Sequence, residues 1–103
     1  MDLRDLTAEN TQQYVGSTFR LDFGEGRSVD LVLDRVEVLL EKHASKRLTR
    51  DSFGMYFAGP KDLYIPQGMY ATFHDAMGGP MQIFYVPIRR REDGAYEYEA
   101  VFT

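Results

Sequence analysis

The stretch from Val29 to Leu40 decides the fold, and it reads Val-Asp-Leu-Val-Leu-Asp-Arg-Val-Glu-Val-Leu-Leu. Apolar and polar residues alternate along it, as they do in a β-strand with one buried face. The apolar positions are odd-numbered up to Leu33 and even-numbered from Val36 onward. Because strand side chains alternate strictly between two faces, one extra residue must be absorbed near Asp34-Arg35 for both parts to point inward. We therefore predict a β-bulge or sharp bend there, which would let the strand turn the corner of a barrel.

Five further segments have the alternating or continuous apolar composition of short strands. Gly, Pro and Asp, the usual residues of tight turns, separate them. The five segments run from Thr18 to Phe23, from Phe53 to Ala58, from Met69 to His74, from Met81 to Ile88 and from Tyr96 to Phe102. Most connections between them are short enough for hairpins, so the sheet should be antiparallel.

The segments also carry predictions about their ends and faces. We expect Gly59-Pro60 to end the third strand and residues 75–80 to form one turn with two adjacent glycines. The run from Met81 to Ile88 is apolar on both faces, which is typical of a strand covered on both sides. In the last strand the side chains expected to face inward are Tyr96, Tyr98, Ala100 and Phe102, and those expected to face solvent are Glu97 and Glu99.

A short helix should precede the strands, because Thr7 can cap it, Glu9 lies favourably near its positive end and Gly16 can terminate it. It has so few apolar residues that we expect it to cover another element, and residues 41–51 should be a polar loop. The sequence thus predicts one mainly β domain over residues 1–103. Its architecture should be a compact antiparallel six-stranded barrel, or a two-sheet sandwich, with one short N-terminal helix. The kinked second strand favours the barrel.

Composition limits the classes of function. The 103 residues carry a net charge of −4, which disfavours binding of nucleic acid or anionic membranes over the whole surface. The chain has no cysteine, which excludes disulfides, thiolate nucleophiles and cysteine-based metal sites. Its apolar runs are too short to span a membrane, and its first residues lack the apolar core of a signal peptide. We therefore expect a soluble, cytoplasmic protein that binds no membrane.

His74-Asp75 is the pair most suggestive of catalysis, since an imidazole beside a carboxylate can act as a general base. Adjacent strand residues point to opposite faces, however, so we expect a structural histidine that hydrogen-bonds the following turn. His43 and His74 give a weak zinc signal, even with Asp22, Asp30 and Asp34 on a nearby predicted hairpin. The glycine-rich turns do not open a helix, as a phosphate-binding loop must. We expect no enzyme, no metal and no cofactor.

Tyrosines and basic loop residues suggest a binding surface. Its candidate members are Tyr56, Tyr64, Tyr70, Tyr85, Lys46, Arg47, Arg50, Arg89, Arg90 and Arg91. Such a combination is typical of single-stranded nucleic-acid binding on an oligonucleotide-binding-like barrel, and a tyrosine-lined face could instead hold a small molecule or glycan. Tyrosines are equally common at protein interfaces. We favour a structural or protein-interaction module with a protein partner, because catalytic groupings are missing and large apolar residues such as Val32 and Leu39 remain on solvent faces.

The C-terminal half contains the patterns F-x-G-P, L-x-x-P-Q-G-x-Y, H-x-x-M-G, I-F-x-V-P-I and Y-E-A-V-F. With these patterns the chain resembles a family of small bacterial proteins of unknown function, and the resemblance covers nearly its whole length. The matching residues are Phe57, Gly59, Pro60, Leu63, Pro66, Gln67, Gly68, Tyr70, His74, Met77, Gly78, Ile83, Phe84, Val86, Pro87, Ile88 and those from Tyr98 to Phe102. The closing pattern departs slightly, because an additional Tyr96-Glu97 precedes it.

The N-terminal part is similar to the same family at residues 6–9 and 15–19, whereas Asn10 is polar where the family tends to be apolar. The resemblance implies a bacterial or phage-derived protein, often encoded beside tail-collar-type genes. That neighbourhood implies an accessory of a phage-tail-like or surface-fibre assembly. It implies no known activity or active site.

Overall fold

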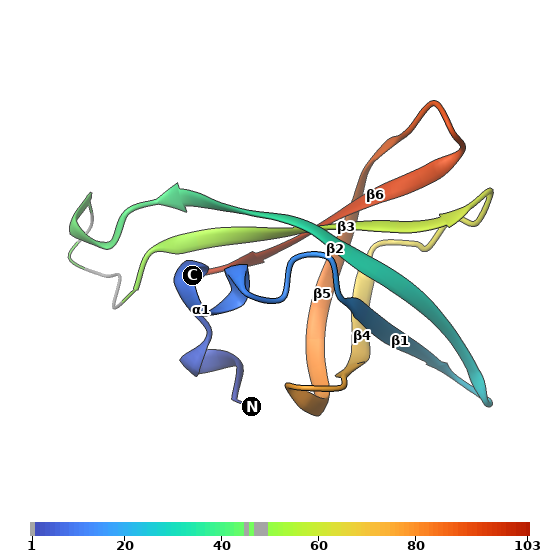
Figure 1. Ribbon diagram of the computed structural model, residues 1–103, viewed down its shortest axis with the longest axis horizontal. Coiled ribbons are helices and arrows are strands. Elements are labelled where there is room, and N and C mark those ends of the chain that lie inside the picture. Colours follow the sequence, from blue (N-terminus) through green and yellow to red (C-terminus); the bar gives the residue numbers. More distant parts are fainter. Residues whose placement is uncertain (1, 45, 47–49) are drawn as a thin grey trace.

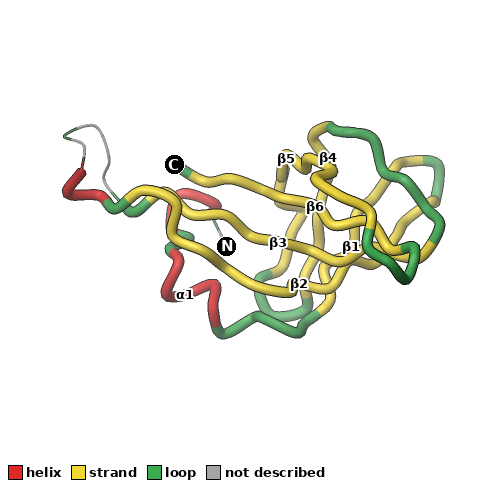
Figure 2. The backbone as a smooth tube through the Cα atoms, turned by 90° about the horizontal axis from the view of Figure 1, so that it is seen from above, coloured by secondary structure: helices red, strands yellow, loops and turns green. Residues whose placement is uncertain are grey.

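The computed structural model describes residues 2–44, 46 and 50–103, and these form a closed antiparallel barrel of six strands (Figure 1, Figure 2). The strands are β1 (Thr18–Gly24), β2 (Arg27–Leu40), β3 (Ser52–Lys61), β4 (Gly68–His74), β5 (Gly78–Arg90) and β6 (Ala95–Phe102). Their order is β1-β2-β3-β6-β5-β4, and β4 pairs with β1 to close the ring. The predicted mainly β fold is confirmed, and the alternative left open between barrel and sandwich resolves to the barrel.

The change of phase within β2 is absorbed by a bulge at the predicted position. Leu33 pairs with Phe57 and Arg35 pairs with Tyr56, which is the next residue along β3 in this antiparallel ladder. Asp34 is therefore the extra residue. The bulge bends β2 so that its two halves serve different parts of the barrel, as the sequence pattern predicts.

Alternate residues of the strands fill the interior. The largest fully buried side chains are Phe19, Leu21, Leu31, Leu33, Phe53, Met55, Phe57, Ile65, Ile83, Tyr85 and Tyr98, together with Leu6 from the N-terminal segment. Beyond the bulge, however, β2 extends past the barrel body (Figure 1). Of its predicted inward residues in this part, Val36 is half-buried, whereas Val38 and Leu40 are 49% and 45% exposed.

Three predictions about strand ends and faces were wrong. β3 continues through Gly59-Pro60 to Lys61, and a Cβ on Gly59 would lie 2.7 Å from the ring of Tyr98. The glycine therefore allows a close approach of the Tyr98 ring and does not mark a turn. β5 begins at Gly78, so the preceding turn comprises only residues 75–77. The outer face of β5 is not covered, because Phe84 is 44% exposed.

The N-terminal segment covers the part of the sheet that extends past the barrel. It consists of the 3-10 turn η1 (Leu3–Asp5) and the helix α1 (Ala8–Gln12), which lies against β2 and β3. Thr7 caps α1 as predicted, since its Oγ1 accepts the Asn10 backbone N–H at 3.0 Å. Asn10 Oδ1 accepts the Thr7 N–H at 2.8 Å in return, which explains a polar residue at this position. Leu6 fills the core beneath, so the helix is a lid, as expected.

Arg50, which follows the second short turn η2 (Lys42–Ala44), fastens this lid. Its Nη1 donates to the backbone carbonyl of Leu3 at 2.9 Å and to that of Leu6. Its Nη2 donates to the Thr103 carbonyl at 3.2 Å. One guanidinium thus ties the start of the chain to its end. Over the described residues, no helix combines the length and apolar content needed to cross a bilayer.

Candidate binding surface

Each arginine of the predicted basic run 89–91 faces a carboxylate. Arg89 donates to Glu97, Arg90 Nη2 lies 2.8 Å from Asp62 Oδ1, and Arg91 Nη2 lies 3.0 Å from Asp34 Oδ2. Phosphate binding requires basic groups whose charge is not already neutralised by the protein. The run therefore supplies far less positive potential than its sequence suggests.

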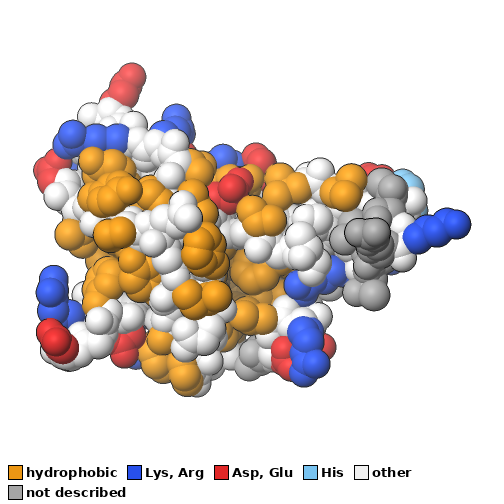
Figure 3. Space-filling model, turned by 180° about the vertical axis from the view of Figure 1, so that it is seen from behind, with side chains coloured by type: hydrophobic (Ala, Val, Ile, Leu, Met, Phe, Trp, Pro, Cys, Tyr) orange, Lys and Arg blue, Asp and Glu red, His pale blue; other side chains and the backbone are white. Residues whose placement is uncertain are grey.

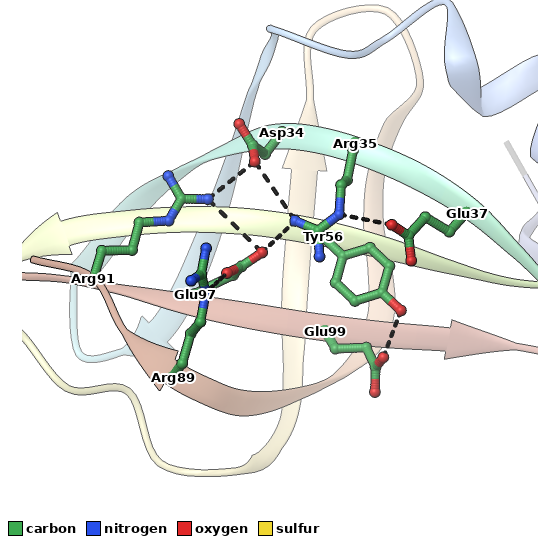
Figure 4. A network of polar contacts seen from close by, with 8 residues as sticks. All are labelled: Asp34, Arg35, Glu37, Tyr56, Arg89, Arg91, Glu97 and Glu99. Atoms are coloured by element: carbon green, nitrogen blue, oxygen red, sulfur yellow. Dashed lines mark hydrogen bonds and ion pairs between the residues drawn. The ribbon is translucent and has the colours of Figure 1, made fainter.

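Glu97 is the centre of a polar network that joins β2, β3, β5 and β6 (Figure 4). Its side chain has no exposed surface. One carboxylate oxygen accepts from Arg35 of β2 and the other from Arg89 of β5, and Arg91 lies 3.8 Å away. Burial raises the pKa of Glu97, but the hydrogen bonds from Arg89 and Arg35 outweigh it, so the pKa is lower than usual. Glu97 therefore stays ionised and holds three strands together.

The prediction that Glu97 faces solvent was wrong. Alternation places it on the outer side of β6, opposite Arg89 in the β5–β6 ladder. Long arginine side chains from β2 and β5 then close over it, because each pairs with its carboxylate. The sequence did contain a signal for this ion pair. Arg89 lies two residues beyond a proline on one strand of a hairpin, and Glu97 lies on the other strand. Opposite charges on facing strands pair.

Tyr56 belongs to the same network and is not an exposed tyrosine. It is 5% exposed, its ring lies 4.1 Å beneath the Arg35 guanidinium, and its hydroxyl donates to Glu99 Oε2 at 2.7 Å. Burial, followed by the contact with Glu99, raises the pKa of Tyr56 to about 12. Three guanidinium groups meet four carboxylates in this network, so it has no net positive charge. The network stabilises the barrel wall.

The other predicted surface residues do not share one face. Tyr85 is fully buried, and the half-buried Tyr70 donates its hydroxyl to the Pro66 carbonyl at 2.6 Å. Lys46 is exposed, Arg50 is engaged in holding the lid, and Arg47 lies outside the described residues. The turn η2 and the hairpin between β5 and β6 lie at opposite ends of the molecule (Figure 1). The described basic residues of these two regions therefore do not flank one common row of tyrosines.

His74 is held by hydrogen bonds that decide its tautomer. Its Nδ1 accepts the backbone N–H groups of Ala76 at 3.1 Å and Met77 at 3.2 Å. A ring nitrogen that accepts hydrogen bonds carries no proton, so the imidazole proton lies on Nε2. Nε2 then donates to Ser17 Oγ at 2.8 Å, and Ser17 Oγ donates to the Tyr14 carbonyl at 2.5 Å. The predicted bond from His74 to the following turn is confirmed, and Nε2 has no free lone pair with which to activate Ser17.

We expect His74 to make the fold sensitive to mild acid. Burial lowers its pKa, so the unfolded chain binds the proton more readily than the folded one. Its contribution to stability is therefore complete above pH 6.5 and is lost as the pH falls through that value towards the lower folded pKa. Urea denaturation from pH 7.5 to pH 5 should show wild type losing more stability than His74→Asn, whose amide oxygen can still accept the turn N–H groups. Equal losses in both proteins would contradict this assignment, since the exposed His43 is present in each.

Polar side chains around His74 and Asp30 do not form a metal site. Of the aspartates considered for such a site, Asp22 and Asp30 are exposed residues of the β1–β2 ladder, whereas Asp34 is the bulge residue of β2 and pairs with Arg91. Within residues 2–44, 46 and 50–103, three His, Asp or Glu side chains nowhere converge closely enough to hold a metal ion.

A cleft with exposed aromatic rings lies between the β1–β2 hairpin and the β3–β4 loop. Its volume is about 280 Å³, and its walls are Phe23, Arg27, Ser28, Val29, Leu63, Tyr64 and Pro66. Tyr64 is 54% exposed and meets the ring of Tyr96 edge-on, with centroids 5.3 Å apart. Of the four tyrosines predicted to form a surface, Tyr64 is the one that lines this cleft.

Large apolar side chains also lie on the outer wall formed by β4 and β5. Met69 and Phe84 are directly opposite each other in the β4–β5 ladder, and they are 57% and 44% exposed. Figure 3, which views this side, shows hydrophobic side chains gathered over the body of the barrel. Adjacent exposed apolar residues of this size are typical of contact surfaces. We refer to them as the Met69–Phe84 pair.

In comparisons with known proteins, the chain matches one family model. Residues 6–102 match the family model described as "Domain of unknown function (DUF6916)". The match spans all six strands and helix α1, and it agrees with the resemblance of the sequence to an uncharacterised family. No curated protein and no solved structure matched the chain.

Proposed function

The chain belongs to the DUF6916 family, a domain of unknown function, and we propose that it acts as a structural or protein-interaction module. The Met69–Phe84 pair carries this proposal. Two large apolar side chains side by side on a barrel wall cost solvation free energy in an isolated domain. A protein partner that covers them would recover about 1 to 2 kcal/mol for each side chain.

The same proposal assigns the module no catalytic role. The grouping nearest to a catalytic one is Ser17 with His74, and it has the wrong proton arrangement for a nucleophile and its base. The buried carboxylate Glu97 is shared between guanidinium groups and is closed off from solvent. The available acid, base and nucleophile are therefore engaged in holding the fold.

We place the module in a phage-tail-like or surface-fibre assembly of a bacterium, as the resemblance over nearly the whole chain implies. A small closed barrel suits such a setting, because without cysteine it folds with no disulfide and it can be attached through one wall. Single-stranded nucleic-acid binding is less favoured, since the arginines of residues 89–91 already face carboxylates.

Site-specific photo-crosslinking in the source cells tests this function. A photoreactive phenylalanine analogue in place of Phe84 should give one reproducible adduct with a distinct protein or with another copy of the chain. The matched control carries the analogue at Val32, which is 41% exposed on an outer position of β2, and it should give none. Adducts absent at both positions, or equal at both, would refute the proposed contact surface.

The aromatic cleft favours a second function, the binding of a small sugar or similar ligand. Sugars stack their apolar C–H faces on aromatic rings, and Arg27 and Ser28 could donate hydrogen bonds to hydroxyl groups at the same site. Titration of the protein with mono- and disaccharides, followed by NMR, should shift the amide signals around Tyr64. Tyr64→Ala should abolish these shifts, and unchanged spectra with every sugar would remove this candidate.

A further inference from the structure

β5 exchanges one neighbour for another along its length. Residues 81–85 pair with β4, and from Val86 onward the strand pairs with β6. Backbone hydrogen bonds from other described segments do not reach residues 81–85. The edge of this segment that points away from β4 is therefore unpaired. In Figure 1, no strand runs along the lower part of β5 on the side away from β4.

Between Pro80 and Pro87, this free edge carries no charged side chain, proline or bulge that would block pairing with another chain. Natural sheets protect exposed edges with lysine, proline, charged side chains or bulges. Residues 81–85 read Met-Gln-Ile-Phe-Tyr, which includes no charge, no proline and no glycine. Apolar, uncharged segments of this kind pair readily with other strands. The outer side chain Phe84 is exposed beside Met69, so the apolar wall reaches this edge.

We propose that this edge pairs antiparallel with the same edge of a second copy of the chain, about a two-fold axis near Ile83. The proposal rests on the interaction function proposed above and names the partner. A second copy fits because it supplies an uncharged strand of matching length with an unpaired edge. The two-fold arrangement satisfies both edges at once and leaves neither free for further growth.

Side chains on the outer face would add to this contact. With Ile83 on the axis, Phe84 of one copy lies across from Gln82 of the other, and Met69 flanks Phe84 on the neighbouring strand. The two Met69–Phe84 pairs would then meet diagonally across the axis, with the two Gln82 side chains beside them. Apolar cross-strand neighbours of this kind stabilise a sheet, whereas charges placed there oppose pairing.

Light scattering coupled to size-exclusion chromatography of the purified chain tests the proposal. Wild type should approach twice the chain mass of 11.9 kDa as concentration rises. Phe84→Lys should weaken dimerisation by about tenfold or more, because it places a charge beside each edge and removes the apolar contact. Val32→Lys is the matched control, since Val32 is 41% exposed but pairs on both sides, with Thr18 and Ala58. It should leave the dimer unchanged.

A monomeric wild type at every concentration would overturn the proposal, as would equal dissociation of both variants. A second measurement covers the case in which Phe84→Lys fails to fold. The chain has no cysteine, so a mixture of Gln82→Cys and Phe84→Cys proteins should form an intermolecular disulfide, because these two positions lie directly opposite each other in the proposed register. A mixture of Gln82→Cys and Val32→Cys proteins should not. A monomer that still gives a photo-adduct with a different protein at position 84 would refute the dimer and leave the interaction function intact.

Discussion

Replacing Glu97 by Gln is expected to lower the free energy of unfolding by about 2 to 4 kcal/mol. The carboxylate accepts hydrogen bonds from Arg35 through one oxygen and from Arg89 through the other. A glutamine side chain keeps one acceptor but turns its NH₂ group towards the second guanidinium, so two donors face each other inside a fully buried site. Urea denaturation at pH 7 measures the loss.

Glu37→Gln is the control for this prediction. Glu37 also pairs with Arg35, at 3.0 Å, but its side chain is 50% exposed. Exposed ion pairs contribute at most about 1 kcal/mol, so this variant should remain close to wild type. Similar losses for the two variants would show that burial of Glu97 is not what makes its ion pairs important.

The contribution of Glu97 to the stability of the fold should also depend on pH. Its folded pKa lies below the ordinary value of 4.5, so the ionised carboxylate stabilises the fold above pH 4.5. This contribution is lost as the pH falls through the lower folded pKa. The difference in stability between wild type and Glu97→Gln should therefore shrink in acid. A difference that stays constant down to pH 3 would contradict the assignment.

Replacing Gly79 by Ala is expected to lower the free energy of unfolding by about 3 kcal/mol or more, or to prevent folding. Gly79 has a φ of +143°, and a Cβ there would lie 2.6 Å from the backbone oxygen of Thr72 and 3.0 Å from the Phe73 ring. The backbone oxygen cannot move aside without disturbing β4. Thermal unfolding followed by circular dichroism measures the effect.

Gly78→Ala separates the clash from the backbone strain. Gly78 also has a positive φ, +80°, but a Cβ there would meet no atom within 4 Å. This control variant should lower the free energy of unfolding by about 1 to 2 kcal/mol through backbone strain alone. If both variants were equally destabilised, the close approach of β4 to Gly79 would have no energetic role.

Periodicity predicted the strands well because it depends on neighbouring residues. The bulge in β2 followed from the change of parity between Leu33 and Val36, and Asp34 is indeed the extra residue. The choice between barrel and sandwich could not be made, because it depends on whether β4 meets β1. That contact rests on three residue pairs between distant segments, beginning with Arg20 and Phe73.

The candidate surface was less well predicted, because residue type was given more weight than position. Tyr85 shares its parity with Met81 and Ile83, which places it in the interior, where all three are found. Tyr56 alternates out of the barrel, yet Arg35 covers it. The bond between Ser17 and His74 joins residues 57 apart, and local pattern holds no signal for such a contact. Coverage by long side chains from other strands is a property of the assembled wall.

The bonds of Arg50 bring residue 3 close to residue 103, since one guanidinium reaches the backbone carbonyls of Leu3 and Thr103. A short peptide is therefore enough to connect these two residues in a circular chain. New termini could then be opened in the exposed β5–β6 connection at residues 92–93 without breaking a strand. Such a circular permutant would present its ends at the opposite pole of the molecule (Figure 1), where a fused protein would leave the lid undisturbed.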